Sequence, residues 1–76
     1  MSKTIDRKHD QARDTKTPAA RLQELALDTN LHTRFLVARN RATPIRVLWS
    51  LTDDKSGQVC VAADQNIRWR LRPTAK

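Results

Sequence analysis

The sequence has little of the residues that disulfide frameworks, metal sites and phosphate loops require. Cysteine occurs once, at Cys60, which excludes an internal disulfide and any multi-cysteine metal site and favours a reducing, cytoplasmic location. Glycine also occurs once, at Gly57, which leaves no glycine-rich phosphate loop. No apolar run approaches the roughly 18 residues that a membrane span needs, and the N-terminal stretch lacks the apolar segment of a secretory signal. We therefore expect no cofactor and no membrane association.

Groups that could perform catalysis are also scarce. The sequence contains no familiar nucleophile–base arrangement, no paired carboxylate motif and no zinc-ligand spacing. His9 and His32 each stand without a Cys or a second His at ligand spacing, and Cys60 is expected to be a small buried hydrophobe. We predict that the protein is not an enzyme.

Basic residues outnumber acidic ones and are distributed unevenly. The formal net charge is +7 over 76 residues, and residues 67–76 contribute +4 because they hold four basic residues and no acid. Residues 44–66 carry a net charge of −1. A basic chain attracts polyanions such as nucleic acid, but the same charge suits a protein with a solvated basic surface. Charge by itself leaves both interpretations open.

The remaining composition favours a folded, mainly helical domain. Hydrophobic residues make up 38% of the chain, with one Gly and three Pro. Thr17 followed by Pro18 predicts a helix start, because Thr is a good N-cap and Pro fits the first helical turn. Leu22 and Leu25 then follow three residues apart on one apolar face. We predict a helix over 18–27.

A second helix is predicted over 31–40. The carboxylate of Asp28 can accept backbone N–H bonds from residues two or three ahead, which separates this helix from the one before it. The helix is expected to end at Asn40, a residue that tolerates the left-handed C-cap conformation. Its expected inward-facing residues are Leu31, Phe35, Val37 and Ala38, with Leu36 at the margin.

The same pattern of residues occurs twice in the sequence, with the two copies 26 residues apart. Thr43 and Pro44 restart the pattern, predicting a helix over 44–52 and then a short helix whose apolar face holds Val59, Ala62 and Ala63. A period of this length is typical of stacked helix pairs. The identities between the copies fall on caps, breakers and core positions: Thr17/Thr43, Pro18/Pro44, Leu22/Leu48, Leu25/Leu51, Asp28/Asp54 and Asn40/Asn66.

These residues resemble a known family. The stretch LALDTNLHTRFLVARNRATP, residues 25–44, is similar to the leucine-rich repeat variant, a bacterial α-helical repeat, and the resemblance covers about residues 17–66. The second copy is weaker, because Thr52, Cys60 and Asp64 replace the family's Ala, Arg and Ala. The positions that fit are Leu25, Ala26, Asp28, Arg34, Val37, Ala38, Asn40, Thr43 and Pro44, and in the second copy Leu51, Asp54, Val59 and Asn66.

The resemblance implies an all-α fold, a short right-handed α-helical solenoid of about two to two and a half repeats. Each repeat would pair a longer helix with a short α or 3₁₀ helix. One family member is associated with an iron–sulfur cluster held by cysteines outside its repeats, a role that the single Cys60 cannot carry. The resemblance assigns the matched residues to the scaffold and implies little about activity.

The expected organisation is one repeat domain with short ends. Residues 1–16 are polar and mixed in charge, which predicts a flexible tail, with a frayed helix as the less favoured alternative; residues 73–76 are expected to be a disordered end. The domain spans 17–72. It divides into a repeat at 17–42, a repeat at 43–68 and a truncated cap at 67–72.

The stretch IRWRLR, residues 67–72, is the strongest local feature. In an extended segment its alternation would place Ile67, Trp69 and Leu71 on one side and Arg68, Arg70 and Arg72 on the other. Arginines beside an indole suit phosphate binding and base stacking. Alternatively, the apolar half closes the end of the stack and the arginines keep that end soluble.

Other candidate binding residues lie around the second predicted helix. Arg34, Arg39, Arg41 and Arg46 could form a basic stripe, although Arg34 could equally be structural and pair with Asp28 or Asp54. Trp49, at the edge of an apolar stripe, is expected to pack in the core rather than to serve as a stacking platform. The full set of predicted binding residues is Arg34, Arg39, Arg41, Arg46, Arg68, Trp69, Arg70 and Arg72.

Two functions remain open at this point. The first is a small non-catalytic repeat module that binds a protein partner or a second copy of itself, because about two repeats leave an end of the stack uncovered. The second is a basic nucleic-acid-binding protein that uses its Arg-rich surface, with Arg34, Arg39, Arg41, Arg68, Arg70 and Arg72 as the contacts.

Overall fold

The regular structure is entirely helical. The computed structural model describes residues 3–72, with side chains from residue 7 onward, and this range holds five α-helices and no strand. The all-α class expected from the sequence is therefore confirmed. The helices are α1 (Lys3–Arg13), α2 (Ala19–Leu25), α3 (Leu31–Arg39), α4 (Ile45–Leu51) and α5 (Gly57–Leu71).

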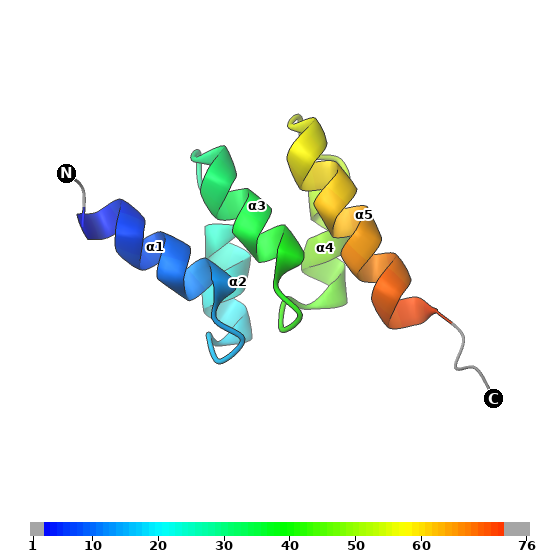
Figure 1. The fold of residues 1–76 in the computed structure, drawn as a ribbon, viewed down its shortest axis with the longest axis horizontal. Helices are drawn as coiled ribbons and strands as arrows, with labels where there is room; N and C mark the ends of the chain where they lie inside the picture. The colour runs from blue at the N-terminus through cyan, green and yellow to red at the C-terminus, as the bar shows by residue number, and fades with distance from the viewer. Residues whose placement is uncertain (1–2, 73–76) are drawn as a thin grey trace.

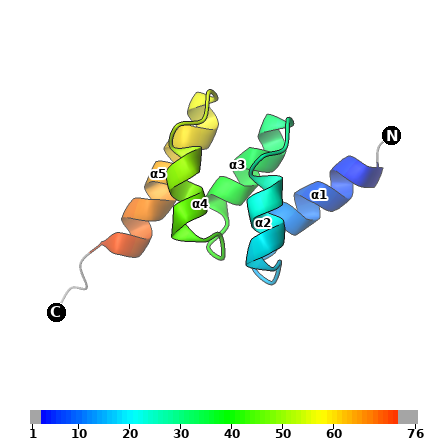
Figure 2. The same cartoon turned by 180° about the vertical axis from the view of Figure 1, so that it is seen from behind.

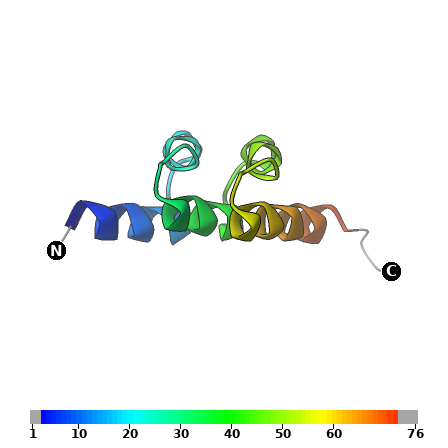
Figure 3. The ribbon, with the colours of Figure 1, turned by 90° about the horizontal axis from the view of Figure 1, so that it is seen from above.

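The helices form two layers. α1, α3 and α5 lie side by side in one layer, and α2 and α4 lie behind it (Figures 1 and 2). Seen from above, the second layer covers only one side of the first, so the other side of α1, α3 and α5 is open (Figure 3). α3 packs against both α1 and α5, and α4 packs against α5. Each helix of the first layer thus covers its neighbour.

The core lies between the layers and along the contacts of α3. Leu22, Leu25, Leu48 and Leu51, the repeated leucines, are all buried, as the spacing predicted. The pattern works because two leucines three residues apart lie on one face of a helix. The other buried hydrophobic residues of the described chain are Ala12, Ala26, Val37, Ala38, Val47, Val59, Ala62, Ala63 and Ile67.

The expected flexible tail is corrected by α1. Residues 3–13 form a helix that packs on α3, and the side chain of Ala12 is fully buried there. The amide of Asn40 donates from Nδ2 to the carbonyls of Ala12 (2.8 Å) and Asp14 (3.0 Å), which ties the end of α1 to the end of α3. The polar composition was misleading because a small buried Ala lets the helix backbones approach closely. The expected disordered end at 73–76 lies outside the described residues.

Several contacts recur with the 26-residue offset of the sequence. As Asn40 donates to the carbonyls of Ala12 and Asp14, Asn66 donates to the carbonyls of Ala38 (2.9 Å) and Asn40 (3.0 Å). The hydroxyl of Thr17 donates to the Gln11 carbonyl, and that of Thr43 to the Val37 carbonyl. Lys8 pairs with Asp28, and Arg34 pairs with Asp54. Lys8, Gln11 and Ala12 thus extend the pattern into α1.

The local signals had partly different roles from those expected. Asn40 has φ −77° and ψ 125°, an extended conformation rather than the left-handed one, because its side chain bridges to α1. Thr17 and Thr43 do not cap the next helix, whose N-caps are Pro18 and Pro44; their hydroxyls bond back to the preceding helix. The carboxylate of Asp28 does accept the N–H of Asn30, as predicted.

Helix lengths and one segment also depart from expectation. Within each pair the second helix is the longer: α2 and α4 have 7 residues, α3 has 9 and α5 has 15. α5 continues to Leu71, so residues 67–71 are helical and the alternation of IRWRLR does not separate two sides. At the start of α3, Leu31 is exposed rather than inward.

Candidate functional site

Arg34 belongs to the scaffold. Its guanidinium forms a two-point ion pair with Asp54, with Nε–Oδ2 at 2.7 Å and Nη2–Oδ1 at 3.1 Å. Its Nη1 donates to the carbonyls of Asp28 (2.8 Å) and Thr29 (3.0 Å), at the turn between α2 and α3. The residue is 7% exposed, so the guanidinium has no surface to offer a ligand. The structural alternative foreseen for Arg34 is confirmed.

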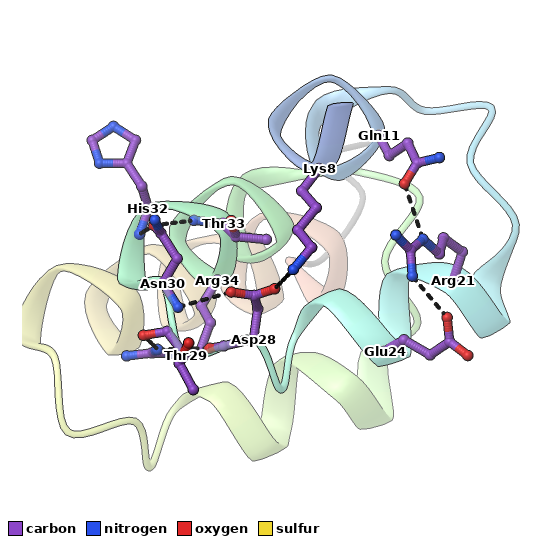
Figure 4. A network of polar contacts seen from close by, with 10 residues as sticks. All are labelled: Lys8, Gln11, Arg21, Glu24, Asp28, Thr29, Asn30, His32, Thr33 and Arg34. Atoms are coloured by element: carbon purple, nitrogen blue, oxygen red, sulfur yellow. Dashed lines mark hydrogen bonds and ion pairs between the residues drawn. The ribbon is translucent and has the colours of Figure 1, made fainter. Parts of the chain in front are cut away.

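The two repeated aspartates are held ionised by their partners. The hydrogen bond from Arg34 lowers the pKa of Asp54 below its ordinary value, and the Ser56 N–H adds to this effect against the opposing cost of burial. The hydrogen bond from Lys8 lowers the pKa of Asp28, with help from the Asn30 N–H. Figure 4 shows Asp28 between Lys8 and Asn30, close to Arg34. Both carboxylates are acceptors for structural donors.

Arg70 is also unavailable for binding. Its Nη2 donates to the Asn40 carbonyl at 3.0 Å and to the Arg41 carbonyl, and its Nη1 donates to the Thr43 carbonyl. Burial lowers the pKa of this guanidinium. The Arg70 side chain therefore binds the loop between α3 and α4. Arg70 was expected in the binding surface, and that expectation is corrected. The helical course of α5 turns Arg70 toward that loop.

Arg46 and Arg68 lie apart from the other candidates. Arg46 is on α4, in the second layer, where its guanidinium reaches the Gln23 carbonyl oxygen Oε1 at 3.5 Å. Arg68 pairs with Asp64 one turn earlier on α5, at 2.8 Å. The eight predicted binding residues therefore do not form one surface.

Three of the predicted arginines do gather with Trp69. The Arg41 guanidinium carbon lies 4.8 Å from the Trp69 ring centroid, and that of Arg72 lies 5.4 Å from it. Arg39 lies over the Phe35 ring at 5.7 Å. All three arginines are exposed. Within residues 7–72, Arg39, Arg41 and Arg72 form no ion pair and donate no side-chain hydrogen bond.

These side chains surround hollows between α3 and α5. A hollow of about 190 Å³ is lined by Arg39, Arg41, Ala62, Gln65, Asn66 and Trp69. A second, of about 720 Å³, adjoins it and shares Arg39, Ala62 and Gln65; it is also lined by His32, Phe35, Gly57, Gln58 and Val61. No acidic residue lines either hollow. We call this feature the α3–α5 groove, defined by Phe35, Arg39, Arg41, Gln65 and Trp69.

Phe35 and Gln65 were missed as groove residues. Phe35 was expected to face inward, but it is only partly buried and carries Arg39 on its ring. The signal was present in the helical spacing: Phe35 and Arg39 are four residues apart, as are Gln65 and Trp69. What the sequence did not show is that the two pairs line adjoining hollows of one groove.

The end of the stack at α4 and α5 forms a second candidate surface. Trp49 is 54% exposed and Leu71 is 61% exposed, so the expected core position of Trp49 is wrong. Val47, Leu48 and Leu51 take the inward positions of the short helix α4, which leaves Trp49 on its outer side. A hollow of about 380 Å³ is lined by Trp49, Asp64, Ile67, Arg68, Leu71 and Arg72. We call this surface the C-terminal end.

The remaining reactive side chains do not assemble into a site. Cys60 is partly exposed rather than buried, with Sγ 3.4 Å from the Gly57 carbonyl. His9 and His32 stack with ring centroids 5.5 Å apart, between α1 and α3. Across the described residues, His, Cys, Asp and Glu side chains nowhere form a group of three or more that could hold a metal ion. No helix in that range has the length and apolarity to cross a membrane.

Comparison with known proteins adds no relative. No family model, no curated protein and no solved structure matches the chain. The functional argument therefore depends on the two surfaces described above.

Proposed function

We propose that the chain is a non-catalytic helical-repeat module, similar to the leucine-rich repeat variant, that associates with a second copy of itself. The recurrence of the Asn, Thr and ion-pair contacts at 26 residues supports stacking of equivalent units into a short right-handed solenoid. The polar residues that the two repeats share are occupied by these contacts. The binding surfaces therefore consist of residues that differ between the two repeats.

Trp49 is the observation that carries the proposal. The residue 26 positions earlier is Gln23, on α2, whose side chain accepts a hydrogen bond from Arg46 on the next short helix, α4. By this equivalence, Trp49 occupies the position that contacts the next unit of a stack. Instead its indole is 54% exposed, beside the exposed Leu71. A large apolar side chain that stays exposed where the next unit of a stack would pack is typical of an interface.

The other end of the molecule is polar. There Arg21 donates to Gln11 and pairs with Glu24, and Lys8 pairs with Asp28 (Figure 4). Stacking this end on Trp49 would bury charged groups against an indole, which is unfavourable. Head-to-tail growth is therefore disfavoured.

The C-terminal end is suited to a copy of itself. It presents apolar Trp49 and Leu71 together with charges of both signs, Asp64 and Arg68. In a two-fold arrangement the same patch meets itself, so an Arg68 of one copy can face an Asp64 of the other while the apolar residues pack together. We therefore propose a closed dimer through this end.

The test is the molar mass measured by light scattering during gel filtration over a concentration series. We expect a mass approaching twice the 8.7 kDa of the chain, and a return to 8.7 kDa for Trp49→Glu. The matched control is Val61→Glu, which is equally exposed at 54% but lies on α5 in the α3–α5 groove, and it should remain dimeric. Circular dichroism checks that both variants are helical. A wild-type chain of 8.7 kDa at every concentration would overturn the proposal.

A further inference from the structure

Arg39 and Arg41 of the α3–α5 groove, and Arg72 next to it on Trp69, have no ion-pair or hydrogen-bond partner among the described residues, unlike most of the other arginines. Arg13, Arg21, Arg34 and Arg68 pair with carboxylates, and Arg70 binds main-chain carbonyls. The guanidiniums of Arg39, Arg41 and Arg72 instead lie over aromatic rings, and all three residues are exposed. Unneutralised guanidiniums held side by side are suited to phosphate groups, which they can bind through two hydrogen bonds.

We propose that the α3–α5 groove binds single-stranded nucleic acid. Phosphates contact the guanidiniums of Arg39, Arg41 and Arg72, and bases stack on the exposed rings and guanidinium planes of the groove. Gln65 lines both hollows of the groove and supplies an amide that can donate to a base or accept from it. This site is distinct from the C-terminal end; Arg72 lines that end and reaches the groove only through its contact with the Trp69 ring.

Flat side chains favour a nucleic acid over an acidic peptide. Aromatic rings follow one another from α1 to α3: His9 lies 5.5 Å from His32, His32 lies 6.4 Å from Phe35, and the Arg39 guanidinium lies over Phe35. Farther along, Trp69 carries Arg41 and Arg72. A carboxylate-rich peptide needs cations but gains nothing from a row of planar surfaces, whereas unpaired bases stack on them.

The open side of the first layer leaves room for a strand. α2 and α4 cover one side of α1, α3 and α5 (Figure 3), and no residue of α2 or α4 lines either hollow of the groove. No acidic residue lines either hollow of the groove. Phosphate approach is therefore unopposed within the groove.

Fluorescence anisotropy with a labelled oligothymidine of about 12 nucleotides tests the proposal, since single-strand sites span roughly 4–16 nucleotides. With three phosphate contacts, the slope of log K against log salt concentration should be about −2, which weakens binding about twentyfold between 50 mM and 200 mM salt. Arg41→Ala should weaken binding at least about fivefold at 50 mM salt and make the slope about 0.7 less steep.

Arg46→Ala is the matched control, because it removes the same charge from an exposed position on α4, in the other layer. Its affinity should stay within about twofold of wild type, since only diffuse charge is lost. Arg41→Lys keeps the charge and should keep most of the salt slope, while losing affinity because lysine lacks the planar fork. Thermal melting of each variant checks that folding is unchanged.

Four results would overturn the inference. They are no binding at 50 mM salt, an equal loss of affinity for Arg41→Ala and Arg46→Ala, equally tight binding of a duplex of the same length, and displacement of the strand by polyglutamate at equal charge concentration. The last result would assign the groove to an acidic polypeptide. Trp49→Glu should bind the oligonucleotide as wild type does, so failure of the dimer proposal and failure of this one are distinguishable.

Discussion

At the scale of single residues, buried polar side chains determine how the helices are joined. Arg34 satisfies a carboxylate and two main-chain carbonyls at once, so its removal would leave several buried groups without a partner. Asn40 and Asn66 act similarly, each donating to two carbonyls of the preceding long helix. These side chains replace the disulfides or metals that often stabilise chains of this size.

The lowered pKa values of Asp28 and Asp54 make stability depend on pH in the acid range. A carboxyl whose pKa is depressed in the folded state contributes stability above its unfolded pKa of about 3.9, and the contribution is lost as the pH falls through the folded value. We expect the free energy of unfolding, measured by urea denaturation, to decrease as the pH falls below about 4.

Asp54→Asn isolates one of these contributions. The variant should be less stable than wild type at pH 7, because the buried Arg34 guanidinium loses its ionic partner, and its stability should fall less between pH 4 and pH 2. Asp53→Asn, at an exposed neighbouring position, should keep the acid dependence of the wild type. Identical pH profiles for Asp54→Asn and wild type would contradict the assignment.

At the scale of helices, no element of this chain is stable by itself. α2 and α4 have 7 residues and α3 has 9, below the roughly 12–15 residues at which isolated helices become marginally stable in water. Each helix forms because it packs on others. α1 illustrates this most clearly, since its sequence has few apolar residues and its burial comes through Ala12 and its contact with α3.

The role of α1 predicts a stability effect that its composition hides. Ala12→Glu should lower the free energy of unfolding by at least about 2 kcal/mol, because a carboxylate would be buried between α1 and α3. Deletion of residues 1–14 should also lower the melting temperature, since it removes both carbonyls that accept from the Asn40 amide. Thr15→Glu, on the exposed loop after α1, is the control and should be close to neutral. Unchanged melting of the deletion would restore the interpretation of a tail.

At the scale of the whole molecule, one hydrophobic core joins the two layers of helices, which are otherwise open to solvent. The described chain extends 49 × 27 × 18 Å, and its hydrophobic residues form one continuous cluster from Ala12 to Ile67. An elongated shape with one continuous core leaves two kinds of surface, the face of the first layer and the ends of the stack. The two proposals place one ligand on each.

The continuous core predicts equal sensitivity in its two halves. Leu25→Ala and Leu51→Ala should each lower the free energy of unfolding by about 2–5 kcal/mol, because each leaves a cavity at an equivalent buried position. Leu27→Ala is the control, since Leu27 is largely exposed, and it should change stability by less than about 0.5 kcal/mol. Denaturant titration followed by circular dichroism measures all three. A large effect for only one of the two buried leucines would contradict a shared core.

The site was predictable from the sequence only in part. Four of the expected binding residues do lie together: Arg39, Arg41, Trp69 and Arg72. Arg70 does not join them, because its guanidinium donates to main-chain carbonyls of residues 27–30 positions away. A sequence does not show whether a charged side chain contacts solvent or a main-chain carbonyl far away along the chain. The same limitation hid the exposure of Trp49, because its neighbours Leu48 and Leu51 fill the inward face of a helix of only 7 residues.

The sequence by itself determined the all-α class, the buried leucines and the Asp28 turn. These features depend on residues within about four positions of one another, where helical periodicity and side-chain-to-backbone bonds act. Only the tertiary structure decided that residues 3–13 belong to the core layer, that Arg34 and Arg70 are scaffold, and that a groove brings Arg39 and Arg41 to Trp69. Those outcomes depend on which helices pack together, and packing brings into contact residues that lie 20 or more positions apart.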